Sequence, residues 1–296
     1  MPIICVPTET ERDLLGQPAL VWDGSGSPPS GIEDVEFFVA PYQPGALDGS
    51  VLAAMPNLKV VQLLSAGFEK WLSILPSGVV LCNGRGVHGG STAELAVGGL
   101  ISLVRQLPRL LDQQRAHDWH PRMTDGLDGK RVLILGAGDI GRRIAAAVGA
   151  FGSEPTLVGR SARDGVHALD EVPVLLPEQD AVVIALPLAA ETKQLVDARF
   201  LAALHDGAIV VNVARGAVVD TAALTAEVMS GRLGAFLDVT DPEPLPADHP
   251  LWDAPNVLIS PHVGGGTNGW QQRGNTLIKD QLARYAANEP LANVVS

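Results

Sequence analysis

RVLILGAGDIG, the sequence of residues 131–141, has the pattern of a buried β-strand that leads directly into a glycine-rich turn. The aliphatic run before the turn is typical of strands in a parallel sheet that is covered on both faces. Gly136, Gly138 and Gly141 have GxGxxG spacing, and an alanine-rich helical pattern continues to Phe151. A strand, turn and helix in this order place backbone N–H groups and the helix N-terminus against a pyrophosphate. The stretch therefore predicts a dinucleotide site rather than a glycine-rich turn without a ligand.

The glycines of this turn are expected to have separate roles. Gly136 permits the tight turn, Gly138 lets the backbone approach the phosphates, and Gly141 lets the helix pack closely on the strand. Asp139 and Ile140 lie between them in the sequence. All five positions are therefore candidate cofactor-binding residues.

The residues after the next predicted strand indicate which dinucleotide is bound. In sites for NAD(H), an acidic residue about 20 positions further on binds the ribose 2′-hydroxyl. This chain instead has Gly159, Arg160, Ser161 and Arg163 in that region. Guanidinium groups bind phosphate well, so we predict NADP(H) as the preferred cofactor and NAD(H) as a second option. The alternative is that both arginines are solvated loop charges.

Apolar runs of strand length recur on both sides of the glycine turn and alternate with helical segments, which predicts an α/β fold. In the N-terminal part the predicted strands are residues 3–6, 19–22, 35–40, 59–64 and 79–82. In the second part they are residues 131–135, 156–158, 181–186, 208–212, 235–239 and 257–260, which predicts a six-stranded parallel sheet. A long helix over residues 94–111 is expected to connect the two parts, and a last helix is expected over residues 275–288.

Length and charge limit the class of protein. A chain of 296 residues exceeds the usual size of one hydrophobic core, so two lobes are expected. The formal net charge of −12 argues against a nucleic-acid or membrane-surface partner. The sequence shows no signal-peptide pattern and no long apolar run, so we expect a cytoplasmic location. Cys5 and Cys82 lie in apolar strand-like runs and are expected to be buried rather than paired in a disulfide.

Three segments that follow predicted strands carry residue types suited to hydride chemistry at a carbonyl. Arg215 follows the strand at 208–212, and its planar fork can hold a carboxylate and polarise a carbonyl. His262 follows the strand at 257–260, and histidine titrates near neutrality, as a proton donor for a ketone requires. Glu243 is the best-placed acidic residue to stabilise the charged imidazole, and Asp241 is the alternative.

Each of these residues also has an ordinary structural interpretation. Arg215 could be a surface arginine, and a loop histidine or a glutamate between prolines has little meaning alone. His249 competes with His262 but lies in a polar loop, where packing or capping is more expected. His88 lies in a glycine-rich loop that could line a substrate crevice.

Taken together, the motifs resemble the D-isomer-specific 2-hydroxyacid dehydrogenase family, and the resemblance runs from Leu63 to His262. The NADPH-using glyoxylate/hydroxypyruvate reductases are the most similar branch at residues 159–161. The segments that carry the resemblance are residues 136–141, 186–188 with 191–192, 212–216, 238–245, 250–252 and 261–265.

The resemblance implies roles for particular residues. Arg215 would bind substrate, Glu243 would pair with the histidine, and His262 would be the general acid and base. The loop of Ser65, Ala66 and Gly67 would receive the substrate carboxylate through its backbone, together with Arg215 and His262. Besides the glycine turn and residues 159–163, the implied cofactor contacts are Leu186, Pro187, Thr192, Val213, Ala214, Asp238, His262 and Gly264, of which Asp238 would hold the nicotinamide carboxamide.

The resemblance also implies two Rossmann-like, doubly wound parallel-sheet domains. A flavodoxin-like substrate domain would comprise residues 1–92 and 267–296, and an NAD(P)-binding domain would comprise residues 93–266. The expected activity is hydride transfer between NADP(H), or NAD(H), and a small 2-hydroxy or 2-oxo acid such as glyoxylate or hydroxypyruvate. A homodimer built through the cofactor domains is expected, and no metal.

Two other functions stay open from the sequence. A phosphite or phosphonate dehydrogenase of the same superfamily is one, whereas formate dehydrogenases carry glutamine where this chain has Glu243. A non-catalytic, cofactor-sensing protein similar to the corepressors with this fold is the other. Retention of Arg215, Glu243 and His262 together favours catalysis.

Overall fold

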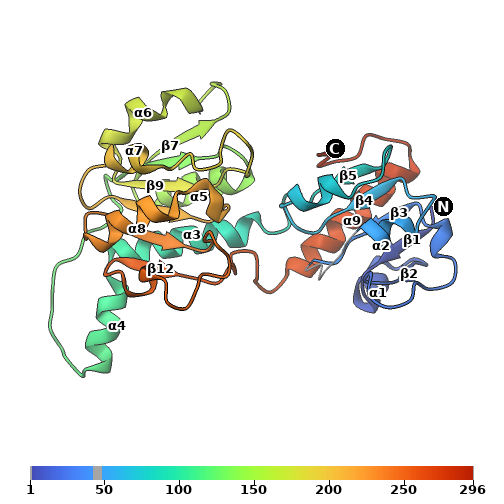
Figure 1. The fold of residues 1–296 in the computed structure, drawn as a ribbon, viewed down its shortest axis with the longest axis horizontal. Coiled ribbons are helices and arrows are strands. Elements are labelled where there is room, and N and C mark those ends of the chain that lie inside the picture. The colour runs from blue at the N-terminus through green and yellow to red at the C-terminus, as the bar shows by residue number, and fades with distance from the viewer. Residues whose placement is uncertain (1, 43–48, 296) are drawn as a thin grey trace. The chain divides into compact units, whose positions relative to one another are not determined.

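The computed structural model describes residues 2–42 and 49–295. The chain divides into two compact units (Figure 1). Unit 1 comprises Met1–His88 and Gly266–Ser296, and unit 2 comprises Gly89–Gly265. These limits differ by one to four residues from the domain limits expected at 92/93 and 266/267. Each unit contains its own parallel sheet, so the predicted α/β class with two parallel-sheet domains is confirmed.

Unit 2 is built on a seven-stranded parallel sheet with the order β12-β11-β10-β9-β6-β7-β8. Its strands are β6 (Arg131–Leu135), β7 (Glu154–Gly159), β8 (His167–Ala168), β9 (Ala181–Ile184), β10 (Ile209–Asn212), β11 (Gly234–Leu237) and β12 (Val257–Ile259). Six of these strands match the predicted runs. The short strand β8 was missed, because two half-buried residues carry no apolar pattern.

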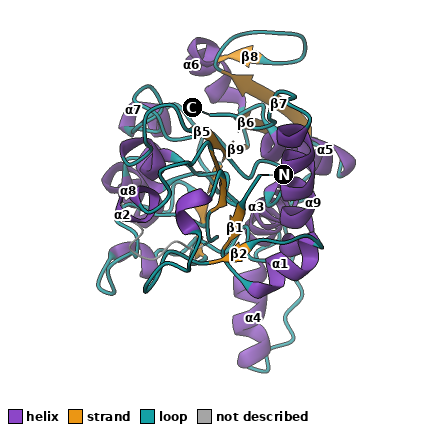
Figure 2. Cartoon of the chain, turned by 90° about the vertical axis from the view of Figure 1, so that its right-hand side faces the viewer, coloured by secondary structure: helices purple, strands orange, loops and turns teal. Residues whose placement is uncertain are grey.

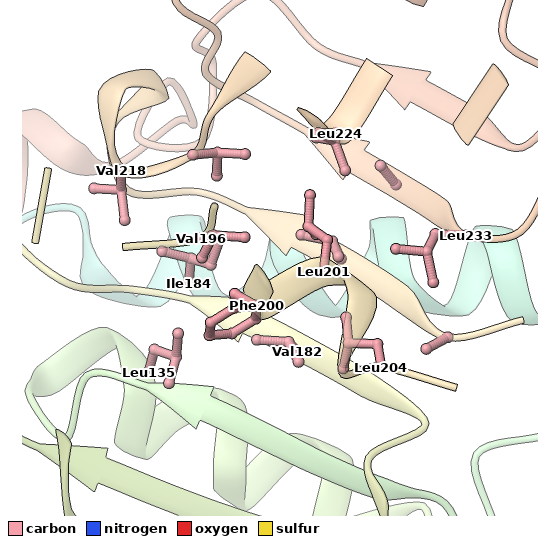
Figure 3. Packing of buried hydrophobic residues seen from close by; sticks show 14 of the residues in the cluster. Leu135, Val182, Ile184, Val196, Phe200, Leu201, Leu204, Val218, Leu224 and Leu233 are labelled. Atoms are coloured by element: carbon pink, nitrogen blue, oxygen red, sulfur yellow. The ribbon is translucent and has the colours of Figure 1, made fainter. Parts of the chain in front are cut away.

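Both faces of this sheet are covered, and the alternation of side chains along β6 shows how. Leu133 and Leu135 pack on one face, while Val132 and Ile134 pack on the other. The first face is covered from α7 (Ala198–Ala202), and Figure 3 shows Phe200 and Leu201 among the buried side chains there. Strand residues on each face therefore lie in a core, which explains their continuous apolar sequence.

The helices of unit 2 connect successive strands or precede the first one. They are α3 (Gly89–Val104), α4 (Leu107–Arg115), α5 (Asp139–Ala150), α6 (Val172–Leu175), α7 and α8 (Thr221–Met229). Within the described residues, no helix is both long and apolar enough to cross a membrane.

The single long helix expected over residues 94–111 was wrong. The structure has two helices, α3 and α4, separated at Gln106, whose φ of 51° is left-handed. Pro108 lies in the first turn of α4. Because proline lacks an N–H and its ring clashes with the carbonyl four residues earlier, the first helix cannot continue through it. Helix α4 projects from the rest of unit 2 (Figure 1, Figure 2).

Unit 1 is built on a five-stranded parallel sheet with the order β2-β1-β3-β4-β5. Its strands are β1 (Ile4–Val6), β2 (Leu20–Val21), β3 (Phe37–Val39), β4 (Val60–Gln62) and β5 (Val80–Cys82). Its helices are α1 (Glu9–Leu15), α2 (Gly49–Ala53) and α9 (Trp270–Ala286). Helix α9 starts five residues before the expected position, and it packs on the first sheet through Ile278 and Leu282.

The two cysteines are free and buried, as predicted. Burial raises the pKa of Cys5 to about 12 and the pKa of Cys82 to about 11. Both thiols therefore stay protonated at neutral pH and behave as small apolar side chains.

Candidate active and cofactor-binding site

The predicted catalytic residues of unit 2 follow three neighbouring strands. Arg215 follows β10, Glu243 lies in the loop after β11, and His262 follows β12. Parallel strands end at the same edge of a sheet, so all three segments start from one edge. The glycine turn follows β6 and starts from the same edge. Ligands of open α/β sheets bind at this carboxyl edge.

His262 and Glu243 are in contact. The imidazole Nδ1 lies 2.6 Å from Glu243 Oε1, which is a short hydrogen bond and an ion pair when the ring is protonated. Both side chains are about half exposed, at 48% and 43%. Glu243 is thus the carboxylate that orients the ring, while the backbone oxygen of the alternative, Asp241, accepts a hydrogen bond from Thr221. The geometry directs Nε2 away from Glu243 as the ring atom available to a ligand.

The backbone at His262 is held in an unusual conformation by Asp238. His262 has a φ of 53°, in the left-handed region that non-glycine residues rarely adopt. Asp238 is buried, with 2% of the residue exposed. Its Oδ1 accepts hydrogen bonds from Ser260 Oγ at 2.6 Å and Val263 N at 2.9 Å, and its Oδ2 accepts one from Gly264 N at 2.9 Å. These bonds fix both sides of the turn that presents the imidazole.

This network gives Asp238 a role that the sequence did not reveal. The resemblance implied a contact with the nicotinamide carboxamide, which stays a prediction. The observed partners of its carboxylate are instead groups of the histidine loop. An acidic residue directly after a fully buried strand was the available signal, because a buried carboxylate requires several donors.

Arg215 is positioned by a second buried polar side chain, Asn212. Asn212 is fully buried; its Nδ2 donates to Arg215 O at 3.0 Å, and its Oδ1 accepts from Ala214 N at 3.0 Å. The Arg215 Nη1 donates to Ala214 O at 2.7 Å. A Cβ at Gly216 would overlap the Thr240 carbonyl, so the loop after β10 lies directly against the loop that leads to Glu243. Arg215 and Glu243, the partner of His262, therefore lie on loops that are in contact with each other.

The glycine turn has the shape that a dinucleotide requires. Gly136 has a φ of 121°, and a Cβ there would overlap the Ala185 carbonyl. A Cβ at Gly141 would overlap the Gly136 carbonyl, so α5 starts in close contact with the turn. Gly138 directly precedes α5, and a Cβ there would meet no atom within 4 Å, which leaves open space over the helix N-terminus. The turn therefore fits a pyrophosphate.

The side chains of Asp139 and Ile140, two predicted cofactor-binding residues, have partners within the protein. The Asp139 carboxylate forms an ion pair with Arg143 Nε at 2.8 Å. A Cβ at Gly89 of α3 would overlap Asp139 Oδ2, so the side chain is directed at α3. The side chain of Ile140 packs in the core shared with α3. Any cofactor contact of these two residues is therefore expected from their backbone.

Two guanidinium groups lie after β7. Arg163 folds back over the strand end, since a Cβ at Gly159 would lie 2.9 Å from Arg163 Nη1. Arg160 Nη2 donates to Glu191 Oε1 at 2.8 Å. Ser161 is exposed beside them. The sequence did not indicate the partner of Arg160, because Glu191 is 31 positions away.

The loop after β9 carries Leu186, Pro187 and Thr192. Thr192 is 5% exposed, and its hydroxyl donates to Pro187 O and accepts from Ala189 N, both at 2.8 Å. The threonine therefore shapes this loop from inside. Val213 and Ala214, which follow β10, are 6% exposed and can offer a ligand mainly their backbone.

The predicted substrate loop belongs to unit 1 and follows β4. Ser65 Oγ donates to Gly67 O at 2.9 Å, and Asn83 Nδ2 donates to Ala66 O at 3.1 Å. His88, also of unit 1, is buried in an aromatic cluster, with its ring 4.6 Å from that of Tyr42 and 5.6 Å from that of Trp270. The cluster joins segments far apart in sequence, so it could not be predicted.

His249 caps a short helix through Nδ1, which accepts from Leu251 N, as its polar loop led us to expect. Among residues 2–42 and 49–295, no three His, Cys, Asp or Glu side chains are grouped to hold a metal ion.

A cavity of about 560 Å³ lies at the opposite, amino edge of the unit 2 sheet. Among the charged residues that line it, Lys130 pairs with Asp180, and Arg232 pairs with Glu227.

Comparisons with known proteins agree with this geometry. Residues 97–264 match the family model of the D-isomer specific 2-hydroxyacid dehydrogenase, NAD binding domain. The chain is 30% identical over 267 residues to glyoxylate/hydroxypyruvate reductase B of Pectobacterium carotovorum, covering 85% of this chain and 83% of that protein. It is 33% identical over 261 residues to D-3-phosphoglycerate dehydrogenase of Mycobacterium leprae, covering 84% of this chain but 49% of that protein.

A solved structure is similar along the whole chain. The D-isomer specific 2-hydroxyacid dehydrogenase from Xanthobacter autotrophicus Py2, in complex with NADPH and MES, superposes with a TM-score of 0.87 and 30% identity. The match covers 100% of this chain and 98% of that one.

Proposed function

Because this chain belongs to the D-isomer-specific 2-hydroxyacid dehydrogenase family, we propose that it reduces a short 2-oxo acid such as glyoxylate or hydroxypyruvate, and oxidises the corresponding 2-hydroxy acid. Members of this family are NAD(P)-dependent oxidoreductases that act on CH–OH groups. The observation that carries the proposal is the 2.6 Å contact between His262 and Glu243 at the carboxyl edge of the dinucleotide-binding sheet. A glyoxylate/hydroxypyruvate reductase among the relatives supports the choice of substrate.

The chain's own residues supply the proton and the anion-binding group. Glu243 accepts a hydrogen bond from His262 Nδ1 and stabilises the protonated ring, which can then release a proton from Nε2 to the substrate oxygen. Arg215 would hold the substrate carboxylate or carbonyl through its fork. The bound nicotinamide would supply the hydride to the 2-carbon. In the reverse direction, neutral His262 takes the hydroxyl proton.

The cofactor is proposed to be NADP(H), with NAD(H) accepted less well. The turn of Gly136, Gly138 and Gly141 suits the pyrophosphate of either. Arg160 and Arg163 follow β7, the strand whose end would face the ribose 2′-position of a bound dinucleotide, and their guanidinium groups would bind a 2′-phosphate there. The NADPH bound to the similar Xanthobacter protein supports the same choice.

Spectrophotometric assays with NADPH and, in parallel, NADH test this proposal. The substrates are glyoxylate, hydroxypyruvate, pyruvate, branched 2-oxo acids and, in the oxidative direction, phosphite. Turnover of a short 2-oxo acid is expected, and His262→Ala should lower it by about two to four orders of magnitude, the usual contribution of a general acid. Turnover of phosphite alone would contradict the proposal, as would unchanged activity of His262→Ala. Cofactor binding without any turnover would indicate a sensing protein.

We also propose a homodimer in which α4 and the segment after it contact the second copy. Helix α4 has no buried residue. Trp119 and Met123, which follow it, are each 95% exposed. Exposed apolar side chains on a projecting arm are typical of an association surface. Sedimentation velocity should show twice the chain mass for the wild type and a monomer for Trp119→Ser/Met123→Ser. A cytoplasmic location stays a prediction from the sequence.

A further inference from the structure

The ion pair between Arg160 and Glu191 joins the loops on either side of the dinucleotide turn. Arg160 follows β7, and Glu191 lies in the loop after β9. Strand β6, which leads into the turn, lies between β7 and β9 in the sheet. The 2.8 Å contact between Arg160 Nη2 and Glu191 Oε1 therefore passes from one flank of the turn to the other. Within the described part of the chain, Glu191 is the carboxylate that pairs with this guanidinium.

Both partners start from well-fixed backbone. The loop that carries Glu191 is held by the buried hydroxyl of Thr192, which bonds Pro187 O and Ala189 N. Arg160 directly follows Gly159, the last residue of β7, and the segment that continues from it is closed by two backbone hydrogen bonds between Arg163 and Val166. The pair is thus a feature of two ordered loops, although its side chains are 82% and 50% exposed.

We infer that Glu191 is a specificity-determining residue that weakens the binding of NADP(H) by competing with its 2′-phosphate for Arg160. The inference rests on the proposed use of this site by a nicotinamide dinucleotide. A guanidinium that already pairs with a carboxylate must release it, at least in part, to pair with a phosphate. The carboxylate left beside the phosphate dianion then repels it. NAD(H) has an uncharged hydroxyl in place of this phosphate, so it does not compete with Glu191 for the charge of Arg160.

The size of the effect follows from the exposure of the pair. Exposed ion pairs are weak and are screened by salt. Glu191→Gln keeps the shape of the side chain and removes its charge, so it should tighten NADPH binding by about two- to fivefold at low ionic strength. The gain should shrink as salt is added, and NADH affinity should not change.

Calorimetric titration of the full-length chain with NADPH, NADH and 2′-phosphoadenosine 5′-phosphate tests the inference without any turnover. The variants are Glu191→Gln, Arg160→Gln and the double variant. Glu178→Gln is the matched control, because Glu178 forms a 2.8 Å pair with Arg131 at the other edge of the same sheet and its loss changes the net charge equally. The 2′-phosphate fragment should follow NADPH, and the control should bind like wild type.

The double variant separates competition from a general charge effect. If Glu191 acts through Arg160, the double variant binds NADPH as weakly as Arg160→Gln alone. A gain that persists without Arg160, or an equal gain for NADH, overturns the inference. So does a loss of NADPH affinity in Glu191→Gln, which would show that the carboxylate helps. If Arg160→Gln changes the affinity for neither cofactor, the proposed NADP(H) preference fails as well. If Arg160→Gln weakens NADPH binding but Glu191→Gln leaves it unchanged, only the role of Glu191 is rejected.

Discussion

At the scale of single residues, the proposed chemistry of this chain depends on which carboxylate contacts His262. Glu243 and Asp241 are two positions apart, and both were candidates from the sequence. In the structure, Glu243 Oε1 lies 2.6 Å from the imidazole Nδ1, and the backbone oxygen of Asp241 accepts a hydrogen bond from the Thr221 hydroxyl. The pairing is decided by the path of the loop after β11, which local sequence patterns do not describe.

Glu243→Gln should therefore lower kcat for 2-oxo acid reduction by about ten- to a hundredfold, because an amide cannot stabilise the imidazolium as a carboxylate does. Asp241→Asn, which removes the same charge two residues away, should keep kcat within about twofold of wild type. Steady-state kinetics across pH checks both variants. Equal losses in the two would mean that net charge near the site, and not the contact with His262, is what matters.

Asp238 acts on His262 through the backbone. Its buried carboxylate accepts from Ser260, Val263 and Gly264, and these bonds hold a left-handed residue in place. Such a conformation costs about 1–3 kcal/mol and persists only where the surroundings impose it.

Asp238→Asn should lower the free energy of unfolding by about 1–3 kcal/mol, because the amide NH₂ would face a buried donor. It should also lower kcat, since the imidazole loses its fixed position. Urea unfolding and steady-state kinetics are the two measurements. Ser260→Ala, which removes one of the three donors, should have the smaller effect on both. A variant as stable as wild type would show that the loop is held by other contacts.

At the scale of elements, α3 shows how a helix is fitted to a sheet. Gly98 and Gly99 are neighbours in this helix, but a Cβ at Gly99 would overlap the ring of Phe236 on β11, while one at Gly98 meets no atom within 4 Å. Of these two glycines, only Gly99 is therefore required for the close approach of α3 to β11. A helical pattern in the sequence could not distinguish them.

Replacing each glycine by alanine should have opposite effects on stability. Gly98→Ala should raise the free energy of unfolding by about 0.5–1 kcal/mol, because alanine loses less backbone entropy in a helix. Gly99→Ala should lower it by about 1–3 kcal/mol, since the added methyl displaces an aromatic ring in a packed core. Chemical denaturation of both variants checks the pair. The same sign for both would show that the space beside Gly99 can relax.

At the scale of the whole molecule, the C-terminal helix completes the N-terminal sheet. Tyr285 on α9 donates to Glu36 Oε2 at 3.1 Å, and Lys59 donates to Glu36 Oε1 at 3.0 Å. The hydrogen bond from Lys59, and then that from Tyr285, lower the pKa of Glu36 below its ordinary value of 4.5. Three segments far apart in sequence therefore meet at one carboxylate.

A glutamate whose pKa is lower in the folded state contributes stability above its unfolded pKa, and this contribution is lost as the pH falls through the folded pKa. Glu36→Gln should therefore destabilise unit 1 at about pH 7, and the difference from wild type should shrink toward about pH 3. Urea unfolding at a series of pH values checks the trend. Glu33→Gln, an exposed glutamate of the same unit, is the charge-matched control and should show no such trend. A difference that grows in acid would contradict the assignment.

The sequence by itself determined the parallel α/β class, the glycine turn and the strand ends that carry Arg215 and His262. These features depend on local order: apolar runs define buried strands, and GxGxxG spacing between a strand and a helix is typical of a phosphate-binding turn. The sequence also contained the break before Pro108, but the periodicity of the apolar residues concealed it. Family membership is shown by the comparisons, and the roles of the site residues stay predictions.

The tertiary structure decided which side chains are in contact: it shows the pair of Glu243 with His262 that the resemblance implied, and it revealed two further pairs that the sequence did not indicate. Glu243 with His262, Asp238 with the histidine loop, and Glu191 with Arg160 are separated by 19 to 31 positions. Each pair joins loops that follow different strands, and the distance between such loops is set by strand order and by the packing of helices on the sheet. Hydrogen bonds and ion pairs act over a few ångströms, so chemistry at this edge could be assigned to particular atoms only after the sheet had brought the loops together.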